Sequence, residues 1–79
     1  MKHARQDYNR IQDPEGRIPE NEPVFLIRGQ DLAAPETLRQ YALQAHRLGA
    51  SNDLVMATLD QARAMEEWAR TVARKTPDL

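Results

Sequence analysis

Residues 46–53 read HRLGASND, and this short stretch decides the fold because it separates two helical patterns. Gly49 follows an amphipathic run and suits the left-handed conformation in which many helices end. Ser51 or Asn52 can cap the next helix by accepting a hydrogen bond from a free backbone amide. A connection of only three residues, Gly49 to Ser51, makes the two helices antiparallel neighbours. The stretch therefore predicts a helical hairpin.

The first helix is predicted over residues 35–48 and the second over residues 52–75. Apolar residues recur at three- and four-residue spacing along both, as in amphipathic helices: Leu38, Tyr41, Ala42, Ala45 and Leu48, then Val55, Leu59, Ala62, Met65, Ala69 and Val72. At 1.5 Å per residue the second helix is roughly 35 Å long and the first roughly 20 Å. The longer helix extends past its partner, so its outer part needs a cover, either residues 24–27 or another copy of the chain.

The N-terminal half is rich in helix breakers. Residues 12–23 read QDPEGRIPENEP, a series of turns. Val24 to Ile27 follow Pro23, precede Gly29 and predict an extended segment. Either this segment pairs with its own copy across a two-fold axis, since the chain offers it no second strand, or it lies across the helices as extended coil.

The domain expected is therefore single, residues 1–79, and mainly α. Residues 1–12 are predicted to be disordered or to form a short helical turn within residues 4–11, where Tyr8 and Ile11 are three positions apart. Residues 13–34 form a Pro-rich extended and turn segment that packs on the hairpin, and residues 35–76 form the hairpin itself.

Composition narrows the range of functions. The chain has 79 residues and no Cys, so disulfides and Cys-based zinc sites are excluded, and its two histidines lie far apart. A domain this small usually needs disulfides, a structural metal or association with a partner to be stable. We therefore expect a homo-oligomer, a dimer or higher. Eleven basic and 12 acidic residues argue against a nucleic-acid partner. Without an apolar leader or a span of about 20 apolar residues, no membrane association is expected and the location predicted is the cytoplasm.

No residue pattern indicates catalysis. Ser51 stands where a helix cap is needed. We therefore prefer a capping role for it over a role as a nucleophile activated by His46. Glu66 and Glu67 point about 100° apart on a helix, so they read as surface ion pairs with Arg63 or Arg70. We expect a non-enzymatic protein without cofactor or metal.

Two groups of residues are candidates for binding. Arg28, Gln30 and Asp31 precede the start of the first helix, where an arginine near free amide groups can hold an anion; His46 and Arg47 are further candidates. The alternative is that Asp31 caps the loop while Arg28 pairs with Asp31 or Glu36. The second group is expected in the core or in a contact between protomers: Phe25, Ile27, Leu59, Met65, Trp68 and Val72. Trp68 could instead stack on a base, but single tryptophans more often anchor cores and interfaces.

The chain resembles small proteins encoded by bacteriophages and prophages, for which no activity is established. The resemblance rests on IPENEPVFLIRGQD at residues 18–31, on APETLRQYA at residues 34–42, and on Trp68, Lys75, Pro77, Asp78 and Leu79; it covers most of residues 11–79. It implies an accessory protein acting in the bacterial host cell.

Three hypotheses about function follow. The first is an oligomeric accessory protein that binds a host protein. The second is a sponge that sequesters an anionic small molecule, such as a nucleotide signal. The third is a helix-turn-helix regulator that binds DNA, which the apolar start of the second helix, Leu54 to Met56, disfavours.

Overall fold

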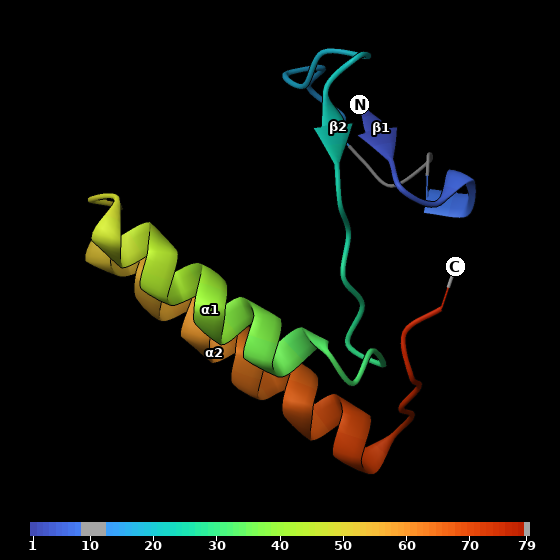
Figure 1. The fold of residues 1–79 in the computed structure, drawn as a ribbon, viewed down its shortest axis with the longest axis vertical. Helices are drawn as coiled ribbons and strands as arrows, with labels where there is room; N and C mark the ends of the chain where they lie inside the picture. Colours follow the sequence, from blue (N-terminus) through green and yellow to red (C-terminus); the bar gives the residue numbers. More distant parts are fainter. Residues whose placement is uncertain (9–12, 79) are drawn as a thin grey trace.

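The computed structural model describes residues 1–8 and 13–78. Along the chain it contains β1 (Lys2–His3), the 3₁₀ turn η1 (Gln6–Tyr8), β2 (Pro23–Val24), α1 (Ala34–Arg47) and α2 (Asn52–Thr71). Figure 1 shows α1 and α2 lying side by side as an antiparallel pair, with both strands in a separate N-terminal arm. We call residues 1–8 and 13–24 the arm, residues 25–33 the link and residues 72–78 the tail. The mainly α hairpin predicted from the sequence is confirmed.

The hairpin turn has the hydrogen bonds that its sequence predicts. Gly49 has a φ of 87°. Its amide donates to the His46 carbonyl at 3.1 Å, and the Ala50 amide donates to the Ala45 carbonyl at 2.9 Å, the two bonds of a Schellman motif. Ser51 then caps α2, its hydroxyl accepting from the Leu54 amide at 3.2 Å. The turn therefore ends one helix and starts the next within four residues.

The second helix is shorter than predicted. It ends at Thr71 rather than at residue 75, and α1 runs over 34–47 rather than 35–48. The cause is a competing set of backbone bonds, because the Lys75 amide donates to the Gln30 carbonyl at 2.7 Å and the Leu32 amide donates to the Lys75 carbonyl at 3.0 Å. These bonds join Asp31 and Lys75 in a parallel bridge. The tail therefore leaves the helix to pair with the link.

The extended segment does have a partner within its own chain. β2 pairs in parallel with β1, with Lys2 opposite Pro23 and His3 opposite Val24. The prediction that no partner strand exists in the chain was therefore wrong, and the ladder includes only the first residue of the predicted segment 24–27. Nothing in the polar pair Lys2 and His3 indicated a strand. Of the turn predicted within residues 4–11, η1 is described, while residues 9–12, including Ile11, lie outside the described residues.

Small residues form the core. Ala34, Ala42, Ala45, Ala62 and Ala69 are its buried apolar residues, together with Pro35 at the start of α1. Among the described residues no large side chain is fully buried. The predicted stripe on α1 is therefore buried at its alanines only, while Leu48 at its end stays 87% exposed. Alanine at the contact positions brings the helix axes close together, which leaves longer side chains at the edges of the contact.

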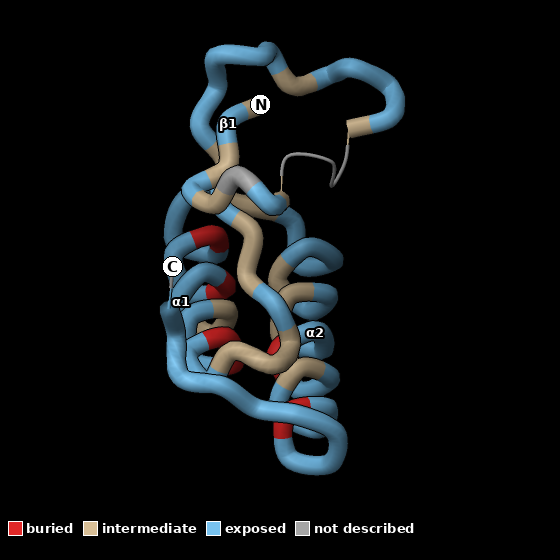
Figure 2. The backbone as a smooth tube through the Cα atoms, turned by 90° about the vertical axis from the view of Figure 1, so that its right-hand side faces the viewer, coloured by how far each residue is buried: buried red, intermediate tan, exposed pale blue. Residues whose placement is uncertain are grey.

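The link runs along the line where α1 and α2 meet, which we call the furrow, and Figure 2 shows its path between the two helices. Gly29 lies against α2, so a Cβ built on it would be 3.8 Å from Met65 Cγ and from Trp68 Cε3. Ile27 lies farther along the same furrow, beside residues of both helices. The outer part of α2 is thus covered by the chain itself at Met65 and in part at Trp68, whereas Val72 stays 64% exposed.

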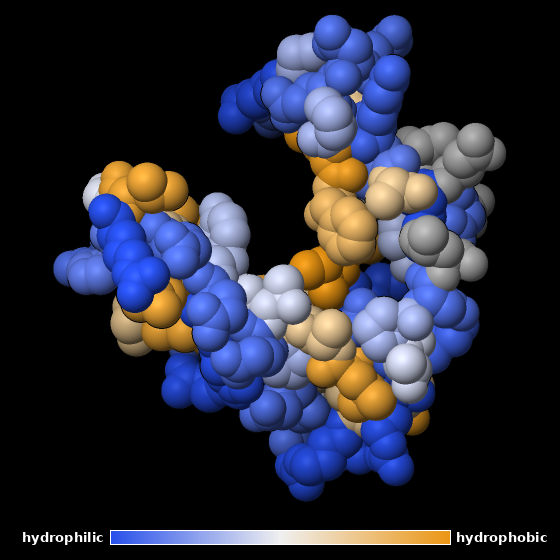
Figure 3. Space-filling view, in the orientation of Figure 1, coloured by the Kyte–Doolittle hydropathy of each residue, from blue (hydrophilic) through white to orange (hydrophobic). Residues whose placement is uncertain are grey.

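The molecule exposes more surface than its mass calls for. Its accessible surface is 6210 Å², whereas a compact monomer of 9.1 kDa exposes about 4,900 Å². Its radius of gyration is 13.8 Å, against about 11.6 Å for a compact domain of this length. Both comparisons reflect the hollow between arm and hairpin that Figure 3 shows.

Candidate functional site

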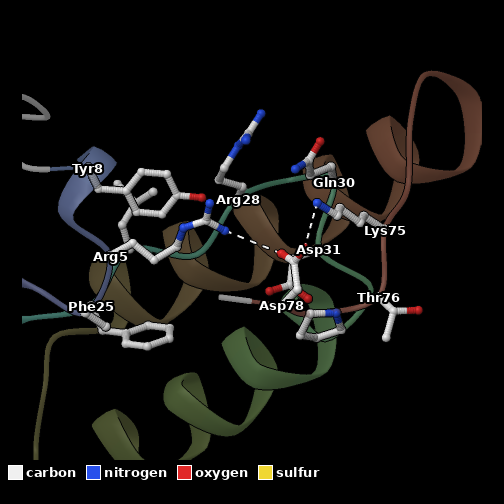
Figure 4. A pocket seen from close by; sticks show the side chains of 12 residues that line it. Arg5, Tyr8, Phe25, Arg28, Gln30, Asp31, Lys75, Thr76 and Asp78 are labelled. Carbon is white, nitrogen blue, oxygen red and sulfur yellow. Dashed lines mark hydrogen bonds and ion pairs between the residues drawn. The ribbon is translucent and has the colours of Figure 1, made fainter.

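A small pocket lies where the arm, the link and the tail meet. Its volume is about 90 Å³. Side chains from all three segments surround it (Figure 4): Arg5 and Tyr8 from the arm, Phe25, Arg28, Gln30 and Asp31 from the link, and Lys75, Thr76 and Asp78 from the tail. The backbone bonds between Lys75 and the link fix the tail beside Gln30 and Asp31. Three of the five predicted anion-binding residues, Arg28, Gln30 and Asp31, therefore lie in one pocket.

Ion pairs fill one side of this pocket. Arg5 donates two hydrogen bonds to the Asp7 carboxylate, at 3.1 and 3.0 Å, and its Nη1 lies 3.4 Å from Asp78 Oδ1. Lys75 Nζ lies 2.8 Å from the other oxygen of Asp78. The Arg5 guanidinium also lies over the Tyr8 ring, 5.0 Å from its centroid. We call Arg5, Asp7, Lys75 and Asp78 the clasp, because their contacts join the arm to the tail.

The clasp shifts the titration of its own groups. The hydrogen bond from Lys75 holds the pKa of Asp78 below its usual value, and the positive charge of Arg5 acts in the same direction. The hydrogen bond from Arg5 likewise lowers the pKa of Asp7, while that contact raises the pKa of Arg5. Both carboxylates are therefore ionised at neutral pH, and each neutralises a cation of the clasp.

Arg28 is different from the other cations of the pocket. No carboxylate of the described chain forms an ion pair with it, so the expected pair with Asp31 or Glu36 does not form. In Figure 4 its guanidinium points away from Asp78. Asp31 behaves as the capping alternative predicts, with Oδ1 accepting from the Ala33 amide at 2.8 Å. Arg28 is thus a pocket cation without an ion pair in the described chain, and from a distance its charge also helps to lower the pKa of Asp7.

The other two predicted anion-binding residues lie elsewhere. His46 and Arg47 belong to the last turn of α1, are exposed, and stand at the hairpin turn. The pocket adjoins the opposite end of α1, roughly 20 Å away for a helix of 14 residues. Since one protomer cannot bring these two residues to Arg28, they do not contribute to the same site within a single chain.

Sequence reasoning missed the side of the pocket that the arm and the tail form, including the polar residues Arg5, Tyr8, Lys75, Thr76 and Asp78. Arg5 and Asp78 are 73 positions apart, and no local pattern predicts a contact at that separation. Lys75 was assigned to the end of the second helix, where a cation has a simple explanation in the helix dipole. The pairing of the tail with the link is the feature that changes its role.

Glu66 also pairs with a residue that the sequence did not suggest. Its carboxylate accepts two hydrogen bonds from Arg39 Nη2, both at 3.1 Å, across the hairpin. Glu67 pairs with Arg70 as expected, and Arg63 pairs with Asp60 instead. These are contacts of the exposed helix faces, and none of them adjoins the pocket.

Comparison with protein-family models, with curated proteins and with solved structures finds no match. Within the described residues, no group of three or more His, Asp or Glu side chains could hold a metal ion. No helix in the described part of the chain is both long and apolar enough to cross a membrane.

Large apolar side chains form the second notable surface. Of the six residues predicted for the core or a protomer contact, Ile27, Leu59 and Met65 are half-buried, while Phe25, Trp68 and Val72 are exposed. Further exposed apolar residues are Leu32, Tyr41, Leu43, Leu48, Leu54 and Met56. Leu32, Trp68 and Val72 stand where α2 ends and the tail meets the link; we call these three the terminal patch. Tyr41, Leu48 and Leu54 stand at the other half of the hairpin.

Proposed function

We propose that this protein is a non-catalytic binding protein, which works as a homo-oligomer and holds a protein partner in the cytoplasm of a bacterial host. The observation that carries the proposal is the distribution of apolar side chains. The described core consists of alanines and a proline, while nine large apolar residues are exposed. A monomeric domain normally buries such side chains, and extensive apolar exposure is typical of surfaces that bind other proteins.

The excess surface gives the scale of this binding. The chain exposes about 1,300 Å² more than a compact monomer of its mass. A standard protein–protein interface takes about 800 Å² from each partner. The surplus is therefore large enough for one standard interface and part of a second, which supports a protein that meets both its own copy and another protein.

The terminal patch is the surface that we assign to the protein partner. Trp68 lies with one part of its indole near Gly29 and is 43% exposed. Val72 lies one helical turn after Trp68, and the Leu32 amide bonds to the Lys75 carbonyl, so both add exposed apolar area near the end of α2. Tryptophan is among the residue types enriched at interface hot spots.

Affinity capture from a bacterial lysate tests the proposal. The bait is the whole protein, and the variants are Val72→Asp on the terminal patch and Met56→Asp on the outer face of α2 as a matched control. We expect one host protein to be retained by the wild type and by Met56→Asp but lost with Val72→Asp. Trp68 is the only tryptophan, so titration with the purified partner should shift its fluorescence to the blue. Equal retention by both variants would remove the terminal patch from the proposal.

Sequestration of an anionic small molecule is the second candidate, and one observation favours it. Arg28 lines the pocket without an intramolecular ion pair in the described chain, and Gln30 lies beside it. Against it, Arg5 and Lys75 already share their charges with Asp7 and Asp78. A single free guanidinium in a cavity of about 90 Å³ suits one carboxylate or phosphate group rather than a whole nucleotide.

Native mass spectrometry of gently purified protein separates the two candidates. An added mass in the nucleotide range, together with a rise in melting temperature on adding that nucleotide, would support the sponge. The rise should disappear in Arg28→Ala and persist in Arg47→Ala, since Arg47 lies at the other end of α1. An oligomer without added mass supports the binding of a protein.

A further inference from the structure

One half of the furrow between the helices is open. The link fills the half beside Met65 and Trp68 and leaves the furrow at Ile27. Beyond Ile27 the furrow continues toward the hairpin turn as a groove of about 490 Å³, which we call the open furrow. Its lining consists of Ile27, Thr37, Leu38, Tyr41, Ala57, Thr58 and Gln61. The hollow between hairpin and arm in Figure 3 lies on this side of the helices.

The lining of the open furrow suits burial against protein. None of the described residues that line it is charged. The Thr58 hydroxyl donates to the Leu54 carbonyl at 2.8 Å, so covering Thr58 does not strand its hydroxyl without a partner. Tyr41 is 56% exposed and offers the largest ring of the surface. An aromatic ring with a polar tip is a common anchor in protein interfaces.

The apolar surface continues from the open furrow to the hairpin turn. Leu48 lies seven residues after Tyr41 and Leu54 four residues before Thr58, so helical periodicity places each in line with the furrow. Both are exposed. The open furrow is therefore part of a continuous apolar strip along the hairpin.

We infer that the open furrow binds the same surface of a second copy of this chain. The inference specifies the oligomer contact of the proposed function and rests on it. A two-fold contact places residues near the axis opposite their own copies, so charges there would repel. The uncharged lining meets this condition, whereas it offers no cation to an anionic ligand or to nucleic acid. Two hairpins packed along this strip would form a four-helix arrangement.

The area available agrees with this occupant. Each protomer of a standard dimer buries about 800 Å², and the whole chain, its arm included, exposes about 1,300 Å² more than a compact monomer. The hollow in Figure 3 leaves the open furrow accessible from outside the molecule. A partner seated there would cover Tyr41, Leu48 and Leu54 while the terminal patch stays exposed for another protein.

Sedimentation of the whole protein over a concentration series tests the inference. We expect the wild type to dimerise and Ala57→Glu to weaken the dimer by about 100-fold or more, because it places like charges across the two-fold axis. Met56→Glu changes the next residue on the outer face of α2 and should dimerise like the wild type. Far-UV circular dichroism checks that each variant keeps its helices, and Gln61→Lys on the exposed rim replaces Ala57→Glu if that variant does not fold.

Mixing two oppositely charged variants distinguishes the loss of the dimer contact from damage to the fold. Ala57→Glu and Ala57→Lys should each be monomeric alone and should form a mixed dimer together, which native mass spectrometry identifies by its mass. A wild type that stays monomeric, dimers of Ala57→Glu as tight as the wild type, or an apolar molecule found bound in the furrow would each overturn the inference. A monomeric wild type would also remove the homo-oligomer from the proposed function, whereas the other two outcomes would overturn only the furrow contact. Capture of a host protein through the terminal patch would stand in each case.

Discussion

Two glycine-to-alanine substitutions should change the stability in opposite directions. Gly49 has a φ of 87°, and nothing lies within 4 Å of a Cβ built on it. Gly29 does not have a positive φ, and a Cβ there would meet Met65 and Trp68 at 3.8 Å, an ordinary contact distance. At Gly49 there is room for a Cβ atom, but the backbone conformation disfavours an L-residue. At Gly29 the backbone accepts an L-residue, and its Cβ would contact Met65 and Trp68.

The expected magnitudes follow from these two environments. An L-residue in the left-handed conformation costs about 1–2 kcal/mol, which outweighs the smaller gain from a less flexible unfolded chain. We expect Gly49→Ala to destabilise by about 1 kcal/mol. Gly29→Ala gains about 0.4–1 kcal/mol from the unfolded chain and a fraction of the ~0.8 kcal/mol of a buried methyl group. It should stabilise by about 1 kcal/mol.

Thermal unfolding followed by circular dichroism at one fixed protein concentration measures the difference. The concentration must match because association stabilises the folded state. For a domain of this size 1 kcal/mol moves the melting temperature by about 4–8 °C, so the two variants should differ by roughly 8–16 °C. Shifts of the same sign in both variants would refute the argument that backbone conformation, and not space, decides the outcome.

Three further substitutions or conditions test other contacts of the fold. Ser51→Ala removes the cap of α2 and should destabilise by about 1 kcal/mol in urea unfolding, whereas Asn52→Ala should have little effect, since Ser51 accepts the capping bond. Ala62→Leu overpacks the helix contact, where Ala62 is fully buried, and should cost about 1–3 kcal/mol; Ala64→Leu is the exposed control. The clasp should open in acid. Asp7 and Asp78 have pKa values below the usual value of 3.8, so their contribution is complete above that pH and is lost as the pH falls further. NMR shifts of the Lys75 amide between pH 6 and pH 2 should report this opening, and a transition near neutral pH would contradict it.

The sequence predicted the parts of the fold that local chemistry determines. The turn at Gly49 to Ser51 was readable because a left-handed glycine and a side-chain cap each act within a few residues. The helix faces were readable from periodicity. Which side chains of a face are buried was not, because Leu48 and Ala42 follow the same spacing and only the approach of the second helix distinguishes them.

Contacts between distant segments were beyond the sequence. β1 consists of two polar residues, and it becomes a strand only because β2 lies beside it. The end of α2 depends on backbone bonds to Gln30 and Leu32, more than 40 positions away. For the same reason the pocket was predicted only on the side of the link, where Arg28, Gln30 and Asp31 are neighbours in sequence, while Arg5 and Asp78 were missed.

The clasp joins the arm to the tail, and the arm and the hairpin are two units that can open separately. The helices of the hairpin pack through buried alanines. The arm is held together by a two-residue ladder and is attached to the rest of the chain by the link and by the Arg5–Asp78 ion pair at the surface. Amide hydrogens of the arm should therefore exchange with solvent much faster than those in the centre of α1 and α2. A ligand that touches both Arg5 and the tail would hold the arm in place and slow hydrogen exchange at many of its amides. Exchange in the arm would therefore report binding at this small pocket.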